Sequence, residues 1–477
     1  MNTPSTNCCT QQKMPGVYSR RQALSQFGMG LGAFGLADLL ARDSYSQEGV
    51  EARDDSLPGT AEHVIWLFMQ GGPSQVETFD PKPALAKHDG SLLPEEFKKF
   101  DLAQINTADA KVFGPQFEFA KHGESGLEIS SLFPEISKHA DKLAVVRSCY
   151  HELFIHGSAL TMMHTGTRLL GHPSAGSWVV YGLGSETQSL PSYVAMTDSM
   201  FRNGTATFSS GYLPAIYQGT YLRTTGMPIQ NLGRPNGLTE TSQKRVLDQL
   251  KKWNGRHRDN RPIDSRLDAR ISNYELAFQM QMAAPELIDL SKETVATKEL
   301  YGIDGSATDA FGKMCLMSRR MVERGVRYMH LVDADWDAHG DVKGNHQSRG
   351  TAVDKPIAGL LADLEARGLL EKTLVVWSGE FGRTPIMQGS NGRDHHPYGF
   401  SIWMAGGGIK GGKVIGATDD FGFNAVEDRF HVNDLHATMM SLLGVNHEEL
   451  TYLFEGRERR LTDVGGQNDI SHRLVEG

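Results

Sequence analysis

The chain has 477 residues, of which 39% are hydrophobic and 22% are charged, and these values resemble those of globular proteins, so they exclude a wholly disordered chain. The formal net charge of −9 argues against a nucleic-acid partner, which needs clustered positive charge. No run of eighteen apolar residues occurs in the sequence, so we expect no membrane-spanning helix in the mature protein.

The amino terminus has the pattern of an export signal. Two adjacent arginines, Arg20 and Arg21, precede a weakly apolar, glycine-rich stretch over residues 27–40. This order is typical of a twin-arginine signal peptide, although an ordinary basic turn before an amphipathic helix has the same pattern. We expect residues 1–45 to be the signal, and the protein therefore to act in the periplasm or outside the cell.

After the signal, the sequence predicts a short linker and one large domain. Residues 46–60 contain an acidic run typical of a linker, and residues 61–470 form the domain. Within the domain, residues 242–253 and 266–282 have the apolar periodicity of long amphipathic helices. We expect residues 239–290 to be a helical insertion that packs against the sheet or covers its site.

Continuous apolar runs predict buried strands. They cover residues 63–69, 143–147, 326–332 and 373–377, and each precedes a loop of glycine or polar residues. Helical periodicity over residues 357–367 comes before the last of these strands. The alternation of strands and helices predicts an α/β fold, with a doubly wound, mostly parallel sheet and helices on both faces.

The sequence after the last two of these strands is rich in metal-ligating groups, and parallel strands place such loops at one edge of the sheet. Carboxylates and imidazoles are ligands that Zn²⁺ and related ions prefer. Each histidine taken alone has the alternative of being a structural or surface residue. The candidate residues are Asp335, Asp337, His339, Glu380, His395 and His396.

Two further segments are candidates for anion contact. Gly71, Gly72 and Ser74 lie in the loop after the first strand, where backbone N–H groups can cradle an oxyanion, but a tight turn explains the same residues. His156 and Ser158 lie at the start of a predicted helix, whose free N–H groups attract negative charge. A plain N-cap serine is the alternative at Ser158.

Four ordered motifs together resemble the domain-of-unknown-function family 1501, whose exported members are abundant in planctomycetes. The motifs lie at residues 68–83, 336–339, 379–385 and 434–438, and the similarity covers nearly the whole mature chain. That family is similar in turn to sulfatases and alkaline phosphatases. The resemblance therefore implies an alkaline-phosphatase-like sheet and, in active relatives, a two-metal site for ester hydrolysis.

The resemblance to sulfatases is incomplete around the nucleophile. The nucleophile position, nine residues before a Thr-Gly pair, holds His156, and the first strand ends in Gln70 instead of a metal-binding Asp. The later carboxylate remains as Glu380. The resemblance thus implies at most one strongly held divalent metal, Zn or Mn. Its implied ligands are Asp335 or Asp337 together with His339, and His395 or His396.

Three functions are consistent with these residues. The first is an exported, metal-dependent hydrolase of phosphate or sulfate esters, acting on an anionic ester or glycan. In this scheme Asp337, His339 and His396 hold the metal, Glu380 orients water or bridges, and Gly72, Ser74 and Ser158 face the anion. The second is a non-catalytic module of the same fold that binds an anionic glycan or a protein partner. The third is hydrolysis of a different bond, with His156 as the base or as an additional ligand.

Overall fold

The computed structural model describes residues 54, 56–98, 107–187, 189–223, 239–259 and 286–476. The predicted export signal, residues 1–45, and the second predicted helix of the insertion, residues 266–282, lie outside the described residues. None of the helices within the described ranges is long and apolar enough to cross a membrane.

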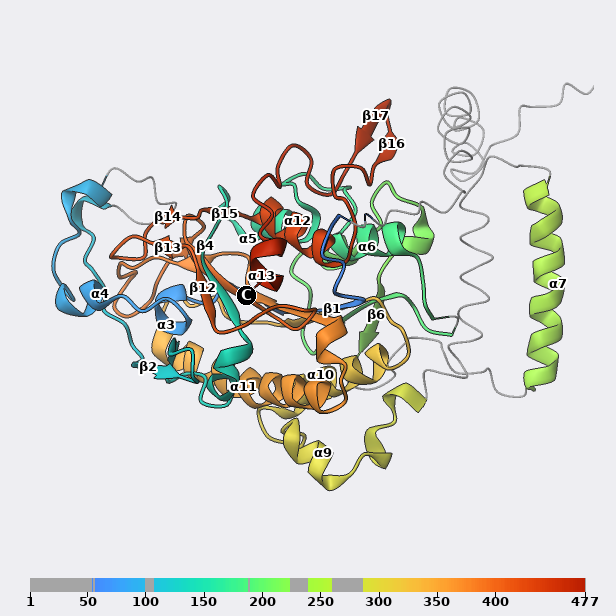
Figure 1. Ribbon diagram of the computed structural model, residues 1–477, viewed down its shortest axis with the longest axis horizontal. Coiled ribbons are helices and arrows are strands. Elements are labelled where there is room, and N and C mark those ends of the chain that lie inside the picture. The colour runs from blue at the N-terminus through green and yellow to red at the C-terminus, as the bar shows by residue number, and fades with distance from the viewer. Residues whose placement is uncertain are drawn as a thin grey trace, which may run out of the picture.

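A nine-stranded sheet lies at the centre of the described chain, in the order β12-β4-β11-β8-β1-β7-β5-β6, with β15 paired to β4 (Figure 1). Neighbouring strands are parallel except at β11, which runs antiparallel to β8 and to β4. The strands are β1 (His63–Met69), β4 (Ala144–Tyr150), β5 (Tyr193–Thr197), β6 (Thr220–Arg223), β7 (Tyr328–Asp333), β8 (Thr373–Ser378), β11 (Phe400–Ala405), β12 (Lys413–Ile415) and β15 (Phe430–His431).

The central strand, β1, explains why the sheet needs helices on both faces. All seven of its residues are buried, as expected of a parallel strand that is covered on both sides. Ile65 and Leu67 belong to the hydrophobic cluster on one face, and Trp66 and Phe68 belong to the cluster on the other. Successive side chains of a strand point to opposite faces, so a continuous apolar run supplies both clusters.

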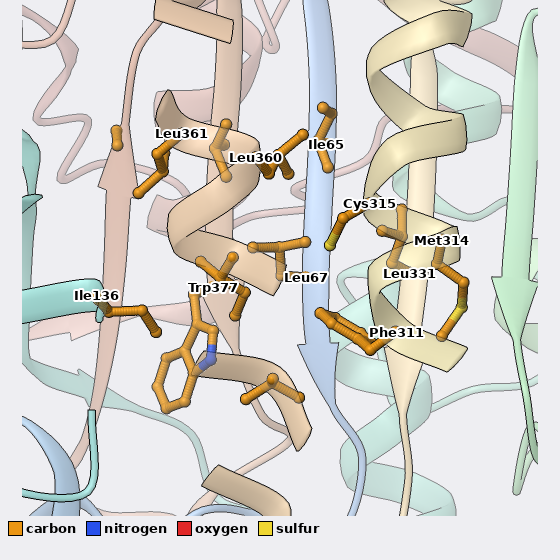
Figure 2. Packing of buried hydrophobic residues seen from close by; sticks show 14 of the residues in the cluster. Ile65, Leu67, Ile136, Phe311, Met314, Cys315, Leu331, Leu360, Leu361 and Trp377 are labelled. Atoms are coloured by element: carbon orange, nitrogen blue, oxygen red, sulfur yellow. The ribbon is translucent and has the colours of Figure 1, made fainter. Parts of the chain in front are cut away.

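Helices cover the two faces in two groups, which confirms the prediction of a doubly wound α/β sheet. The first group packs on the face of Ile65 and Leu67, where Figure 2 shows Phe311, Leu331 and Leu360 around β1. The second group packs on the face of Trp66 and Phe68. The first group is α10 (Asp309–Val322) and α11 (Val342–Ala366), and the second is α5 (His156–Thr165), α6 (Ala175–Leu183) and α12 (Val432–Leu442).

The first predicted helix of the insertion, residues 242–253, lies within α7 (Glu240–Asp259). In Figure 1, α7 stands apart from the sheet. We expected the insertion to pack against the sheet or to cover its site, and residues 260–285 of the insertion lie outside the described residues. The remaining helices and strands are α3 (Gln75–Thr78), α4 (Pro83–Lys87), β2 (Phe119–His122), β3 (Leu127–Ser130), α9 (Val295–Leu300), β9 (Gly382–Arg383), β10 (His395–His396), β13 (Ala417–Thr418), β14 (Ala425–Glu427), β16 (Tyr452–Phe454), β17 (Arg457–Arg459) and α13 (Ser471–Val475).

The carboxyl ends of β1, β7 and β8 meet at one edge of the sheet. The three strands are neighbours and parallel, with Leu67 paired to Leu331 on one side and to Trp377 on the other. The loops that follow these strands therefore start side by side. This is the edge at which an α/β sheet places its ligands.

Candidate metal centre

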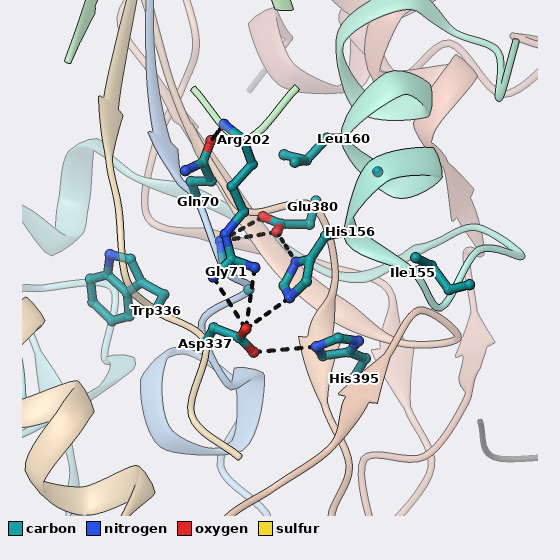
Figure 3. Close-up of polar contacts among 12 residues, drawn as sticks. Gln70, Gly71, Ile155, His156, Leu160, Arg202, Trp336, Asp337, Glu380 and His395 are labelled. Atoms are coloured by element: carbon teal, nitrogen blue, oxygen red, sulfur yellow. Dashed lines mark hydrogen bonds and ion pairs between the residues drawn. The ribbon is translucent and has the colours of Figure 1, made fainter. Parts of the chain in front are cut away.

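Four side chains from separate parts of the sequence converge at this edge. His156 is the first residue of α5, Asp337 and His339 lie in the loop after β7, and His395 lies in β10. One ligand atom from each of the four lies within 4.8 Å of the others. Figure 3 shows His156 and His395 pointing at the carboxylate of Asp337 from α5 and β10. We call these four residues the edge cluster.

Asp337 is the centre of the edge cluster. Its Oδ2 lies 3.0 Å from Nε2 of His156, and its Oδ1 lies 3.1 Å from Nε2 of His339 and 3.2 Å from Nε2 of His395. The two latter nitrogens, on His339 and His395, are themselves only 3.0 Å apart. All three imidazoles thus present the same ring nitrogen, Nε2, to one carboxylate.

The other ring nitrogen of each imidazole, Nδ1, contacts an oxygen acceptor. A neutral imidazole has one N–H and one lone pair, so an oxygen acceptor at Nδ1 allows Nε2 to offer its lone pair to a cation in place of an N–H to Asp337. Nε2 of His339 and Nε2 of His395, 3.0 Å apart, are close enough for one cation to contact both. The acceptors are Oε1 of Glu380 for His156 (2.6 Å), Oε1 of Gln388 for His339 (2.6 Å) and the carbonyl oxygen of Phe154 for His395 (2.8 Å).

Glu380 holds His156 and is itself held by the loop after β1. The backbone N–H of Gly71 donates to both carboxylate oxygens, at 3.0 and 2.9 Å, and the Glu380 side chain is fully buried. Gly71 has φ of 121°, and a Cβ there would lie 2.6 Å from the backbone nitrogen of Asp337. The close approach of this loop to the edge cluster therefore requires glycine.

A buried guanidinium lies beside the edge cluster. Arg383 is fully buried, and its Nη2 donates to Oδ1 of Asp337 at 2.8 Å. Its other N–H groups donate to the carbonyl oxygens of Gly72, at 2.9 Å, of Arg393, at 3.2 Å, and of Gly71. Carbonyl partners on several sides fix the guanidinium in place, so it supplies a permanent positive charge to Asp337.

These contacts shift the pKa values of the acid and of one histidine in opposite directions. Burial alone would raise the pKa of Asp337, but hydrogen bonds from His156 and His395 and the charge of Arg383 outweigh burial and hold that pKa well below its usual range. Burial alone would lower the pKa of His156, but its hydrogen bonds to Asp337 and Glu380 raise it. The carboxylate is therefore ionised and available to a cation.

His396 and Asp335 lie outside the edge cluster. His396 follows His395 in β10, and adjacent residues of a strand point to opposite sides, so only one of the two histidines can face Asp337. The His396 ring donates instead to the carbonyl oxygen of Phe423. Asp335 has φ of 71° and an exposed side chain. The structure therefore brings His395, not His396, together with Asp337 and His339.

Hydrogen bonds and packing contacts also locate the residues that the sequence predicted to contact an anion. The Ser158 hydroxyl donates to the carbonyl oxygen of Ile155 at 3.1 Å, within its own helical turn. Ser74 is buried, and its backbone N–H donates to Nε2 of His346 at 2.9 Å. At Gly72, a Cβ would lie 2.6 Å from the Phe381 ring, so this glycine serves a close packing contact.

Three residues of the site lie outside the residues that the sequence singled out. Arg202, from the loop after β5, reaches Oδ2 of Asp337 with both Nη atoms at 3.2 Å. Gln388 orients His339, and the backbone of Phe154 orients His395. Loop residues and backbone carbonyls have no distinctive sequence pattern, so no signal in one sequence identifies them. Arg383, by contrast, lies inside the motif at residues 379–385 and could have been identified as a candidate.

The fold and the edge cluster define a doubly wound α/β protein with a candidate metal centre at the carboxyl edge of its sheet. The family described as "Protein of unknown function (DUF1501)" matches residues 61–472, so the chain belongs to that family, as its motifs predicted. The search of curated proteins gives no match.

Several solved structures are distantly similar to this chain. A lipoteichoic acid synthase from Listeria monocytogenes is 9% identical, with 90% of this chain and 81% of that chain covered and a TM-score of 0.39. A sulfatase from Pseudoalteromonas sp. is 14% identical, with 87% and 72% covered and a TM-score of 0.35. An alkaline phosphatase from the Antarctic bacterium TAB5 is 8% identical, with 81% and 99% covered and a TM-score of 0.34. Because these identities and TM-scores are low, the strand order of the sheet, and not these similarities, defines the fold.

Proposed function

We propose that this protein is a hydrolase of phosphate or sulfate esters that depends on one divalent metal, and that the edge cluster holds the ion. The observation that carries the proposal is the common orientation of three imidazoles, each with Nδ1 against an oxygen and Nε2 toward Asp337. Metal-binding histidines have this arrangement, in which an oxygen acceptor fixes the ring and makes the free nitrogen more basic.

The donor set favours zinc. Imidazole nitrogen and carboxylate oxygen are the ligands of many zinc sites, and manganese is the alternative for a site with a larger share of oxygen. The site is open on one side, since the side chains of His339 and Asp337 are 35% and 20% exposed. An open side suits a reacting centre better than a purely structural metal.

One ion, and not two, fits the charges at the edge cluster. The buried Arg383 guanidinium already lies 2.8 Å from Asp337, so a second cation on that side would lie next to a fixed positive charge. When bound, one divalent ion supplies Lewis-acid chemistry: it polarises an ester oxygen and makes a water molecule more acidic. Arg383 and Arg202 add positive charge that stabilises an anionic group at the same place.

The edge cluster favours attack by water over a covalent intermediate. Among its four residues and their described partners Glu380, Gln388, Arg202 and Arg383, none carries a hydroxyl or a thiol. The hydroxyl of Ser158 donates to Ile155 within its helix. The same observation also favours a second candidate, a non-catalytic module of the same fold that binds an anionic glycan or a protein partner, because a nucleophile normally divides such reactions into two easier steps.

Metal analysis tests the site. We expect elemental analysis of the protein, purified without added metal, to give about one equivalent of a transition metal, and the double variant His339→Ala with His395→Ala to lose it. His472→Ala is the matched control, because His472 is exposed and lies in α13, outside the edge cluster. An absence of metal in the unaltered protein, or equal metal content in the double variant, would rule out the proposal.

Turnover separates the hydrolase from the binding module. We expect the metal-loaded protein to hydrolyse p-nitrophenyl phosphate or p-nitrophenyl sulfate, and we expect a chelator to abolish that activity. A protein that holds its metal but hydrolyses neither ester, nor a panel of sulfated and phosphorylated sugars, would instead support the binding module.

We also propose that the protein acts outside the cytoplasm. The support is the pair Arg20 and Arg21 ahead of the glycine-rich stretch in the sequence. Replacing both arginines with lysine should retain the protein in the cytoplasm, as measured by cell fractionation. Continued export of the double variant would contradict the assignment.

A further inference from the structure

The loop after β5, residues 198–203, is held beside the edge cluster by hydrogen bonds to Gln70 and to the first turn of α5. Gln70, the first residue after β1, donates from Nε2 to the carbonyl oxygen of Met200 at 3.1 Å and accepts from the backbone N–H of Arg202 at 2.9 Å. Asn203 donates to the carbonyl oxygen of Gly157 in α5 at 2.7 Å. Arg202 is therefore positioned from both sides, and Figure 3 shows its side chain extending from this loop to Asp337.

Arg202 differs from Arg383 in how its guanidinium is held. The Arg383 side chain is fully buried against several carbonyl oxygens, whereas the Arg202 side chain is 33% exposed and contacts Oδ2 of Asp337. The backbone of Arg202 is fixed, but its guanidinium is open to solvent, so the guanidinium can turn toward an arriving anion at small cost in free energy. Its planar N–H groups match the paired oxygens of a phosphate or sulfate group.

A hollow of about 460 Å³ borders the same loop, at the carboxyl ends of β5 and β6. Such a volume is typical of small-molecule sites. Residues on both sides of Arg202 line the hollow, including Met200, Phe201, Gly204 and Thr205. Arg202 therefore lies in sequence between residues that line the hollow, and its side chain reaches Asp337 of the edge cluster.

The lining of the hollow combines aromatic rings with polar groups. The ring of Phe201 lies 5.2 Å from that of Phe208 and 5.4 Å from that of Tyr221, measured between centroids. Asp198 and Arg223 add a carboxylate and a guanidinium to the same lining. Aromatic faces pack against the apolar face of a sugar ring, and charged and hydroxyl side chains bond the hydroxyl groups at its edge.

We propose that Arg202 and this hollow form one substrate subsite, which takes a sugar carrying a phosphate or sulfate ester. The sugar ring occupies the hollow, and the ester group faces Arg202 and the edge cluster. This inference rests on the proposed function, because it places the ester at the proposed metal. It goes further in naming the residues that hold the sugar ring and the ester group.

Binding titrations of the full chain test the subsite. Glucose 6-phosphate and galactose 6-sulfate are the sugar probes, and inorganic phosphate is the probe for the anion alone. We expect Arg202→Ala to weaken binding of all three probes at least tenfold. Arg367→Ala is the matched control, since Arg367 is 42% exposed, is also paired to a carboxylate, and lies at the carboxyl end of α11. Unchanged affinity in Arg202→Ala would overturn the proposal.

The hollow is tested by variants that leave the anion contact intact. We expect Tyr221→Ala to weaken both sugar probes about tenfold and to leave the affinity for inorganic phosphate unchanged. Arg223→Ala, at an exposed residue of the lining, is the second variant in case Tyr221→Ala fails to fold, and we expect it to weaken the sugar probes severalfold. Equal effects on sugar probes and inorganic phosphate, or no effect on either, would exclude the hollow.

Metal content, measured on every variant, separates this inference from the proposed function. Arg202, Tyr221 and Arg223 are not in the edge cluster, so each variant should keep its metal. A protein without metal would count against the proposed function. Unchanged probe affinities in the variants would count against the subsite, whether or not the protein holds metal.

Discussion

Two groups of three histidines lie within one molecule, and α5 contributes to both. His156, at the start of α5, belongs to the edge cluster. His164, near the end of α5, lies in the core with His330 of β7 and His436 of α12. The latter three residues, which we call the core histidines, are at most 3% exposed and surround Trp66 and Phe68.

The two groups differ in their partners. Among the described residues, neither ring nitrogen of His330 has a hydrogen-bond partner, and neither has Nε2 of His164 or Nδ1 of His436. Burial lowers the pKa of His164 and of His436 to about 4, whereas two carboxylates raise the pKa of His156 against the effect of burial. Among the described residues, no hydrogen bond joins a core histidine to a carboxylate. His164 and His436 each have a carbonyl oxygen at one ring nitrogen, so the central carboxylate of Asp337 is what distinguishes the edge cluster.

The largest expected effect comes from removing the central carboxylate. Asp337→Asn should weaken metal binding about a thousandfold, or about 4 kcal/mol, because the neutral amide loses the charge that all three imidazoles face. Competition with a fluorescent chelator measures the affinity. His436→Gln is the control from the core histidines and should keep its metal affinity. Equal losses in the two variants would erase the distinction between the groups.

The second prediction concerns acid stability. A buried histidine with a lowered pKa stays neutral while its unfolded counterpart takes up a proton, so the free energy of unfolding falls as the pH falls from about 6.5 toward 4. For His436 alone this amounts to about 2 kcal/mol between about pH 6.5 and 4.5. Burial raises the pKa of Asp333 to about 7, and that group has the opposite pH dependence.

A comparison of variants isolates the histidine from such opposing groups. The metal-free His436→Gln variant should lose about 2 kcal/mol less stability than the unaltered metal-free protein over this pH range. Urea unfolding at several pH values measures both curves. Parallel curves would show that His436 titrates normally in the folded chain, contrary to the contrast drawn above.

A third, smaller effect on metal affinity is expected from Gln388, which contacts His339 of the edge cluster. Gln388→Ala removes the oxygen that orients His339, so metal affinity should fall about tenfold, or about 1.4 kcal/mol. The same chelator competition gives the value. Gln347→Ala is the matched control, because Gln347 is exposed in α11 and bonds Thr351. If Gln388→Ala binds metal as tightly as Gln347→Ala, the ring orientation does not depend on Gln388.

The smallest effect is expected at Ser158. Its hydroxyl donates to Ile155 within α5. Ser158→Ala should therefore change metal and phosphate affinity less than about twofold and stability by about 0.5 kcal/mol or less. A loss of phosphate affinity comparable to that of Arg202→Ala would instead restore Ser158 to the anion site.

The sequence predicts the centre of the fold better than its margins. Apolar runs at residues 63–69 and 373–377 correspond closely to β1 and β8, because strands buried on both faces need uninterrupted apolar residues. β11 breaks the parallel pattern, and no local signal distinguishes an antiparallel strand from a parallel one in such a run. Strand direction depends on the connections, which are set by the whole chain.

The candidate site is predicted in part for a similar reason. Asp337 and His339 follow a recognisable strand, so their edge of the sheet was predictable. The choice between His395 and His396 depends on which face of a two-residue strand points inward, and the sequence does not contain that information. Arg202 reaches the edge cluster from the end of β5, and only the strand order brings β5 beside β7.

The pairing of β1 also has a consequence for the order of folding. Its two neighbours, β7 and β8, come from the last third of the sequence, so the middle of the sheet stays incomplete until synthesis has passed residue 378. Contacts between such distant segments close large loops and are slow to form. Shortened chains that end before β7 leave a seven-residue apolar strand with both of its edges exposed, and such strands readily aggregate.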